Sequence, residues 1–158
     1  MGKLIALVIL LGAGFGIYRG CFYQSPAYKT YLQWTKATNE GDCKTLYAIS
    51  DGEAKKWVEK FCGGSPGITV MGQTMSVPSA ASAVADLKNT PQGAMQHFQH
   101  EIQSETQAGD GTVSLSVIET VLARPSSFNK PAPPQKHDVK LKEIDGTWKI
   151  LEFNSKDM

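Results

Sequence analysis

The side chains that could perform acid–base chemistry lie on segments with the alternating pattern of strands. The candidates on these segments are His97, His100, Glu101, Glu119 and His137. His100 alternates in step with Phe98 and Ile102, which places all three on one face of a strand. Facing inward beside Glu119 of the neighbouring strand, His100 would form the best acid–base pair that the chain offers. A lone strand histidine is more often a hydrogen-bonded polar residue, so the sequence favours a protein that is not an enzyme.

The spacing of potential metal ligands does not match a metal site. His97 and His100 are three residues apart on a strand and therefore face opposite sides, and no Cys-x-x-Cys pair is present. There is also no phosphate-binding loop, no Ser/His/Asp arrangement and no EF-hand spacing. The 16 Lys and Arg residues nearly cancel the 15 Asp and Glu residues. We therefore expect no metal, no other cofactor and no nucleic-acid partner.

The first residues form a membrane-targeting segment. Lys3 precedes an apolar run that covers residues 4–18 without a charge. Extending the run to Tyr23 gives about 20 residues, the length of a spanning helix, and Arg19 near its end can reach the headgroups. The sequence therefore predicts a transmembrane signal anchor over residues 1–23.

Two alternatives to this anchor stay open. One is a cleaved signal peptide, although the small residues at positions 12–16 make a poor cleavage site. The other is a lipoprotein modified at Cys21, which Arg19 disfavours.

The short N-terminal tail favours a single-pass orientation in the inner (cytoplasmic) membrane. Residues 24–154 would then form one periplasmic domain, with 155–158 as a C-terminal tail.

Cysteine usage agrees with export. Cys43 and Cys62 lie in two segments that both have helical periodicity. In an oxidising compartment these two cysteines most simply form a disulfide, and two buried free thiols are the alternative.

The first part of the domain is predicted to be helical. Ser25, followed by proline, is a helix N-cap, and Gly41 ends that helix. Asp42 can cap a second helix. Ser50, followed three residues later by glutamate, has the form of a capping box for a third helix that ends at Cys62. The first helix carries an aromatic stripe that favours packing over a ligand site: Tyr28, Tyr31 and Trp34.

The second part is predicted to be mostly strand. Residues 68–77 are ambiguous between a strand and a crossing segment, and Ser79 can cap a short helix. Residues 112–124 carry apolar side chains on both faces, which predicts a central strand. Residues 136–144 and a last strand that ends near Phe153 alternate again. Helices followed by strands indicate an α+β fold, with helices packed on one face of a curved antiparallel sheet.

Two short motifs carry a family resemblance. Residues 31–43, which end in Asn-Glu-Gly-Asp-Cys, resemble the opening helix and turn of the nuclear transport factor 2-like superfamily. Residues 145–150, Asp-Gly-Thr-Trp-Lys-Ile, resemble its closing hairpin. The resemblance covers residues 26–153 and implies a cone-shaped pocket between the sheet and the long helix. The stretch 68–88 is longer than the pattern of this superfamily.

The resemblance implies two classes of function. Enzymatic relatives place an acid–base pair inside the cone, which makes an isomerase or dehydratase using His100 and Glu119 the alternative. Many relatives are not catalytic, and we expect an exported, membrane-anchored domain that binds a protein partner or a small apolar ligand. An accessory part of an envelope assembly is one version of this function, and a homodimer stays open. Phe22, Tyr23 and Tyr28, clustered near the anchor, are the expected contact surface.

Overall fold

The computed structural model describes most of the chain after the predicted anchor. The described residues are 24–63, 65–70, 73–88, 97–123 and 133–158. No helix within these ranges is long and apolar enough to cross a membrane. The predicted anchor, with Phe22 and Tyr23, lies outside the described residues.

Three helices follow one another as predicted. They are α2 (Pro26–Glu40), α3 (Cys43–Ala48) and α4 (Gly52–Cys62). Ser25 caps α2 by accepting a hydrogen bond from a backbone amide of the first turn, and Gly41 ends the helix in the left-handed conformation. Cys43 and Cys62 form a disulfide, with their Cα atoms 5.9 Å apart. The predicted pairing is therefore confirmed, and it joins the start of α3 to the end of α4.

A fourth helix, α5 (Ala80–Lys88), packs against α2. Ser79, predicted to cap this helix, accepts a hydrogen bond of 3.1 Å from the amide of Ser82. Gly41 has a φ of 67°, and a Cβ atom at this position would collide with the carbonyl oxygen of Ala81. The glycine is therefore required both for the helix end and for the close approach of α5.

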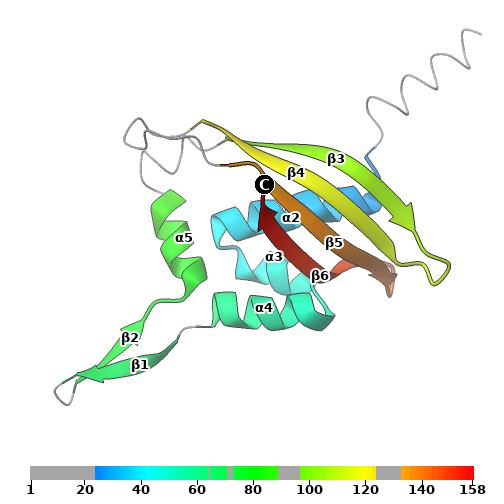
Figure 1. Cartoon of the computed structure of the whole chain (residues 1–158). Coiled ribbons are helices and arrows are strands. Elements are labelled where there is room, and N and C mark those ends of the chain that lie inside the picture. Colours follow the sequence, from blue (N-terminus) through cyan, green and yellow to red (C-terminus); the bar gives the residue numbers. More distant parts are fainter. Residues whose placement is uncertain (1–23, 64, 71–72, 89–96, 124–132) are drawn as a thin grey trace, which may run out of the picture.

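The main sheet has four antiparallel strands in the order β3-β4-β5-β6. Their bounds are β3 (His97–Gln107), β4 (Val113–Ala123), β5 (Gln135–Ile144) and β6 (Thr147–Asp157). The predicted central strand is confirmed, because β4 pairs with both β3 and β5. Figure 1 shows α2, α3 and α4 on one face of this sheet, which we call the inner face.

The last strand is longer than predicted. β6 continues past Phe153 to Asp157, because its final residues pair with the beginning of β5. Residues 155–157 therefore belong to the sheet and not to a tail.

The start of α4 also differs from the prediction. Asp51, and not Ser50, is the N-cap, and its carboxylate accepts a hydrogen bond of 2.8 Å from the amide of Gly52. Ser50 instead forms a parallel bridge with Ile150 of β6. The amide of Asp51 donates to the carbonyl of Ile150, and the amide of Ile150 donates to the carbonyl of Ile49, both at 2.8 Å. Backbone pairing with β6 thus decides which residue begins the helix.

The ambiguous segment is a separate hairpin. β1 (Ser65–Val70) and β2 (Gln73–Val77) form a two-stranded antiparallel sheet. Figure 1 shows this hairpin extending from the end of α4, away from the four-stranded sheet.

The core lies between the helices and the inner face. Its most deeply buried large side chains are Trp34, Tyr31, Leu46, Leu141, Ile150, Val58, Val117 and Val139. The aromatic stripe of α2 therefore packs in the core, as predicted.

The two faces of β4 provide a test of this arrangement. Leu115 is 2% exposed, whereas Leu122 on the opposite face is 63% exposed. We expect Leu115→Ala to lower the free energy of unfolding by about 2–5 kcal/mol, because it leaves a cavity in the core. The same substitution at Leu122 should cost less than about 1 kcal/mol. Urea denaturation of the two variants checks this, and equal losses would contradict the assignment of the faces.

Candidate functional site

Polar side chains gather on the inner face, at the end of the sheet where β3 and β5 begin. The strand register places His100 opposite Glu119, Glu119 opposite Gln135, and Gln135 opposite Asp157. One row closer to the centre, His137 lies opposite Ser155. A polar row therefore crosses all four strands of the sheet, and a second row begins beside it. With a tyrosine from α2, these residues form what we call the polar cluster: Tyr31, His100, Glu119, Gln135, His137, Ser155 and Asp157.

The acid–base pair named from the sequence is in contact. Nε2 of His100 lies 2.8 Å from Oε2 of Glu119. The two side chains are 13% and 12% exposed, so each remains accessible at one edge. The contact arises because the two residues are direct cross-strand partners on the inner face.

A second polar pair lies deeper. The hydroxyl of Tyr31 is 2.7 Å from Nδ1 of His137, and the two residues are 0% and 4% exposed. Burial raises the pKa of Tyr31, and the negative charge of Glu119 raises it further. Burial also lowers the pKa of His137, with His100 acting in the same direction and Glu119 opposing it. Both members of this pair are therefore neutral at neutral pH, and the hydrogen bond satisfies groups that are cut off from water.

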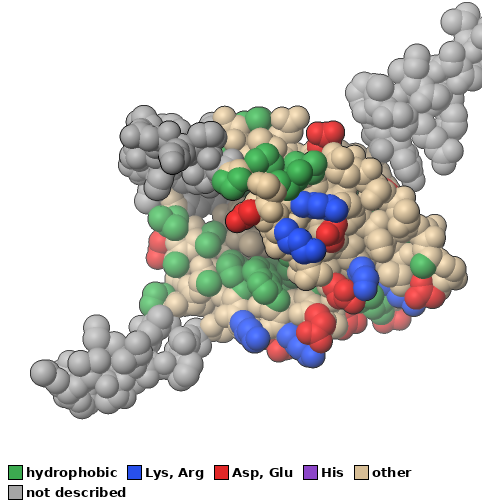
Figure 2. Space-filling view, in the orientation of Figure 1, with side chains coloured by type: hydrophobic (Ala, Val, Ile, Leu, Met, Phe, Trp, Pro, Cys, Tyr) green, Lys and Arg blue, Asp and Glu red, His purple; other side chains and the backbone are tan. Residues whose placement is uncertain are grey.

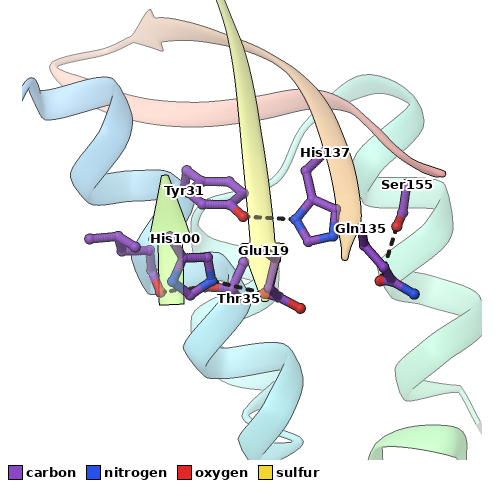
Figure 3. Close-up of polar contacts among 8 residues, drawn as sticks. Tyr31, Thr35, His100, Glu119, Gln135, His137 and Ser155 are labelled. Carbon is purple, nitrogen blue, oxygen red and sulfur yellow. Dashed lines mark hydrogen bonds and ion pairs between the residues drawn. The ribbon is translucent and has the colours of Figure 1, made fainter. Parts of the chain in front are cut away.

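Aromatic contacts fix the orientation of both imidazoles. The ring of Tyr31 meets His100 edge-on, with centroids 5.5 Å apart. Phe153 packs against the ring of His137 at 5.0 Å. Figure 3 shows Tyr31 between the two histidines, so this one residue of α2 connects the polar pairs.

The outer part of the cluster is open to solvent. The hydroxyl of Ser155 donates to Oε1 of Gln135 at 3.3 Å. Nε2 of Gln135 in turn donates to Oδ1 of Asp157 at 3.1 Å, and both bonds are exposed. The cluster therefore changes from the buried His137, through the partly accessible Glu119 and the half-buried Gln135, to the exposed Ser155 and Asp157.

Sequence reasoning missed part of this cluster. The sequence singled out His100 and Glu119 as the inward-facing pair, yet Gln135, His137 and Ser155 also face inward. His137 has the same parity as the buried Val139, so the alternation of β5 contained a signal for it. Ser155 carried no such signal, because the last strand was predicted to end near Phe153.

Other predicted site residues lie elsewhere. Tyr28 is only 7% exposed and stacks on Tyr31 with centroids 5.9 Å apart, so it belongs to the core and not to the surface predicted for it. Its position on the buried stripe of α2 is the reason. Glu101 is exposed and opposes Ile118 on the other face of the sheet. His97 is the first residue of β3.

Among the described residues, neither the potential metal ligands nor the charged side chains form a further site. No three His, Cys, Asp or Glu side chains in this part of the chain are grouped as a metal site. On the face shown in Figure 2, positive and negative side chains are interspersed, and neither sign gathers into a large patch.

Protonation of His137 gives a pH-dependent stability. Its pKa is lowered in the folded protein from an ordinary value of 6.5, so the unfolded chain binds a proton at a higher pH than the folded one. The stability from the neutral ring is complete above about pH 6.5 and is lost as the pH falls toward the lowered pKa. We expect the free energy of unfolding to fall there by at most about 1.4 kcal/mol per pH unit.

His137→Asn is the control for this prediction, because the amide keeps a polar atom near the position of Nδ1 and does not titrate. Urea denaturation of both proteins between about pH 7.5 and 5 compares the slopes, not the absolute stabilities. Parallel pH profiles would contradict the assignment.

Comparisons with known proteins give a likeness of fold. No protein-family model and no curated protein matches the chain. A nuclear transport factor 2-like protein of unknown function from Silicibacter pomeroyi DSS-3 is 14% identical, with a TM-score of 0.47, over 82% of this chain and 91% of that one. One from Shewanella baltica OS155 is 10% identical, with a TM-score of 0.42, over 84% and 93%.

A third similar structure is a putative calcium/calmodulin-dependent protein kinase type II association domain from Thiobacillus denitrificans. It is 9% identical, with a TM-score of 0.47, over 82% of this chain and 92% of that one. Nuclear transport factor 2-like proteins are thus among the solved structures similar to this chain. At these identities the similarity concerns the fold alone.

Proposed function

We propose that this chain is an exported domain, held at the inner membrane by residues 1–23, that binds a ligand at the polar cluster without catalysis. The buried pair of Tyr31 and His137 carries this proposal. The pKa of Tyr31 is raised and that of His137 is lowered, so both pKa values lie further from pH 7 than the ordinary values do. An efficient general acid or base needs a pKa near the working pH. A fixed neutral pair that is cut off from water suits the support of the accessible His100 beside it better than proton transfer.

The cluster favours a ligand with hydrogen-bonding groups. His100 and Glu119 are partly accessible, and beside them lie the half-buried Gln135 and the exposed Asp157. A wholly apolar ligand, the form expected from the sequence, would take the Glu119 carboxylate out of water without replacing its hydrogen bonds. We therefore prefer a polar small molecule, or a polar side chain that a partner protein of the envelope inserts at this edge.

Variants on the two faces of β4 test the binding proposal. The full-length protein is purified from its native envelope, and retained small molecules and proteins are identified by mass spectrometry. We expect Glu119→Gln to lose a ligand that the unaltered protein retains. Ser116→Ala is the matched control, because Ser116 lies on the opposite face, where its hydroxyl donates to Asp138 at 3.0 Å. Identical retained components in both variants would overturn the proposal.

The disulfide and the apolar N-terminal run support export and anchoring. Structural disulfides persist in oxidising compartments, and the pair joins two helices of the domain. Membrane fractions should hold the full-length chain. Recovery of a mature form that begins between residues 14 and 17, in the soluble periplasmic fraction, would replace the anchor by a cleaved signal.

A second function has one specific observation in its favour. The distance of 2.8 Å between His100 and Glu119 would let them act as an acid–base pair of an isomerase or dehydratase. The double variant His100→Ala with Glu119→Gln separates the two functions once a ligand is known. Retained binding with loss of its chemical conversion would favour the enzyme, whereas a ligand recovered unchanged from the unaltered protein would favour the binding domain.

A further inference from the structure

The hairpin β1–β2 is a candidate interaction surface. Its substantial contacts within the described residues are between its own two strands. A two-stranded hairpin without further packing is marginally stable in water, and three or more strands are needed for independent stability. The hairpin therefore gains stability if another strand pairs with it.

The composition of the hairpin differs from that of the rest of the chain. No charged residue occurs between Lys60 and Asp86, in a chain of which 20% is charged. The register places Ile68 opposite Met75 and Thr69 opposite Thr74. The apolar positions are Ile68, Val70, Met75 and Val77.

The two open edges of the hairpin are not equivalent. β1 contains Pro66, and its register shifts between Ser65 and Ile68. Proline and bulges are the devices that protect an edge strand from pairing. β2 runs from Gln73 to Val77 without proline, glycine, charge or a register shift of its own. Among the strands that the structure describes, none pairs with the outer edge of β2, so this edge can accept another strand.

We propose that β2 pairs antiparallel with β2 of a second copy of this chain, which gives a four-stranded sheet in the order β1-β2-β2-β1. A two-fold axis requires a self-complementary surface. An uncharged strand meets this condition, because no like charges face each other across the new pair. The backbone groups of the β2 edge supply the hydrogen bonds of the interface, as in other cases of strand addition.

A lipid surface fits the hairpin less well. Segments that lie on membranes are rich in Lys and Arg and carry aromatic anchors, and the strands β1 and β2 contain neither. Figure 1 also shows the hairpin and the N-terminal end of α2, where the predicted anchor joins the domain, on opposite sides of the molecule. The hairpin is therefore placed for contact with a protein.

The test is the mass of the full-length protein in detergent, measured by sedimentation velocity. We expect two chains of 17.1 kDa per particle for the unaltered protein. Thr74→Lys on β2 should weaken dimerisation by about tenfold or more, because equal charges then meet across the axis. Thr69→Lys is the matched control. It introduces the same residue at the directly opposite position, but on the protected strand β1. It should leave the dimer intact.

Mixing Thr74→Lys with Thr74→Glu protein should restore the dimer, because opposite charges then meet. Restoration also shows that the lysine variant is folded. A monomeric unaltered protein would overturn the proposal, as would a dimer that survives Thr74→Lys or one that the mixture fails to restore. Retention of a different protein on a monomeric chain would likewise assign the hairpin to another partner.

Discussion

Trp34→Ala is expected to lower the free energy of unfolding by about 3–5 kcal/mol. The indole of Trp34 is 1% exposed and lies between the helices and the sheet. Its ring centroid is 5.5 Å from that of Trp57 in α4 and 5.9 Å from that of Phe153 in β6. Alanine would leave a cavity where three elements meet, and a loss of this size is a large fraction of the stability of an ordinary domain.

Trp57→Ala is the matched control, because the same side chain is removed from a position that is 41% exposed. We expect a loss of about 1–2 kcal/mol for this variant, in proportion to the smaller apolar area that it buries. Urea denaturation followed by circular dichroism compares the two. Equal losses would show that Trp34 is not the centre of the core.

Removal of the disulfide is expected to have a similarly large effect. Cys43 and Cys62 are separated by 19 positions, and opening a loop of this length costs about 3 kcal/mol of stability. The disulfide holds α3 to α4, and α4 in turn packs on β6. The double variant Cys43→Ala with Cys62→Ala should therefore unfold at a lower urea concentration than the oxidised protein.

A reducing agent provides the internal control for the disulfide. It should destabilise the unaltered protein and leave the double alanine variant unchanged, since that variant has no such bond to break. Equal stability of the oxidised and reduced forms would contradict the prediction. A mass spectrum under non-reducing conditions checks that the bond joins Cys43 to Cys62.

The polar cluster, where we propose that the ligand binds, lies at one end of the sheet. Tyr31 touches both histidines, so Tyr31→Phe removes the hydrogen bond to His137 while the ring that meets His100 remains. The substitution therefore separates the buried pair from the accessible one, and ligand retention by this variant shows which of them holds the ligand.

The sequence by itself determined most of the local structure. Ser25 and Gly41 marked the ends of α2, and alternation identified β4 and β5, because caps and side-chain periodicity depend on a few neighbouring residues. The same alternation predicted that His100 and Glu119 could meet on one face. The disulfide was predicted because both cysteines lie in helical segments and the expected compartment is oxidising.

Tertiary structure decided what local patterns leave open. Ser50 had the form of a cap, but its pairing with Ile150 moved the start of α4 to Asp51. β6 extended to Asp157 because β5 offered partners for its last residues, which brought Ser155 into the cluster. The contact of Tyr31 with His137 joins residues 106 positions apart. Such contacts depend on how α2 lies across the sheet, and no periodicity within either segment contains that information.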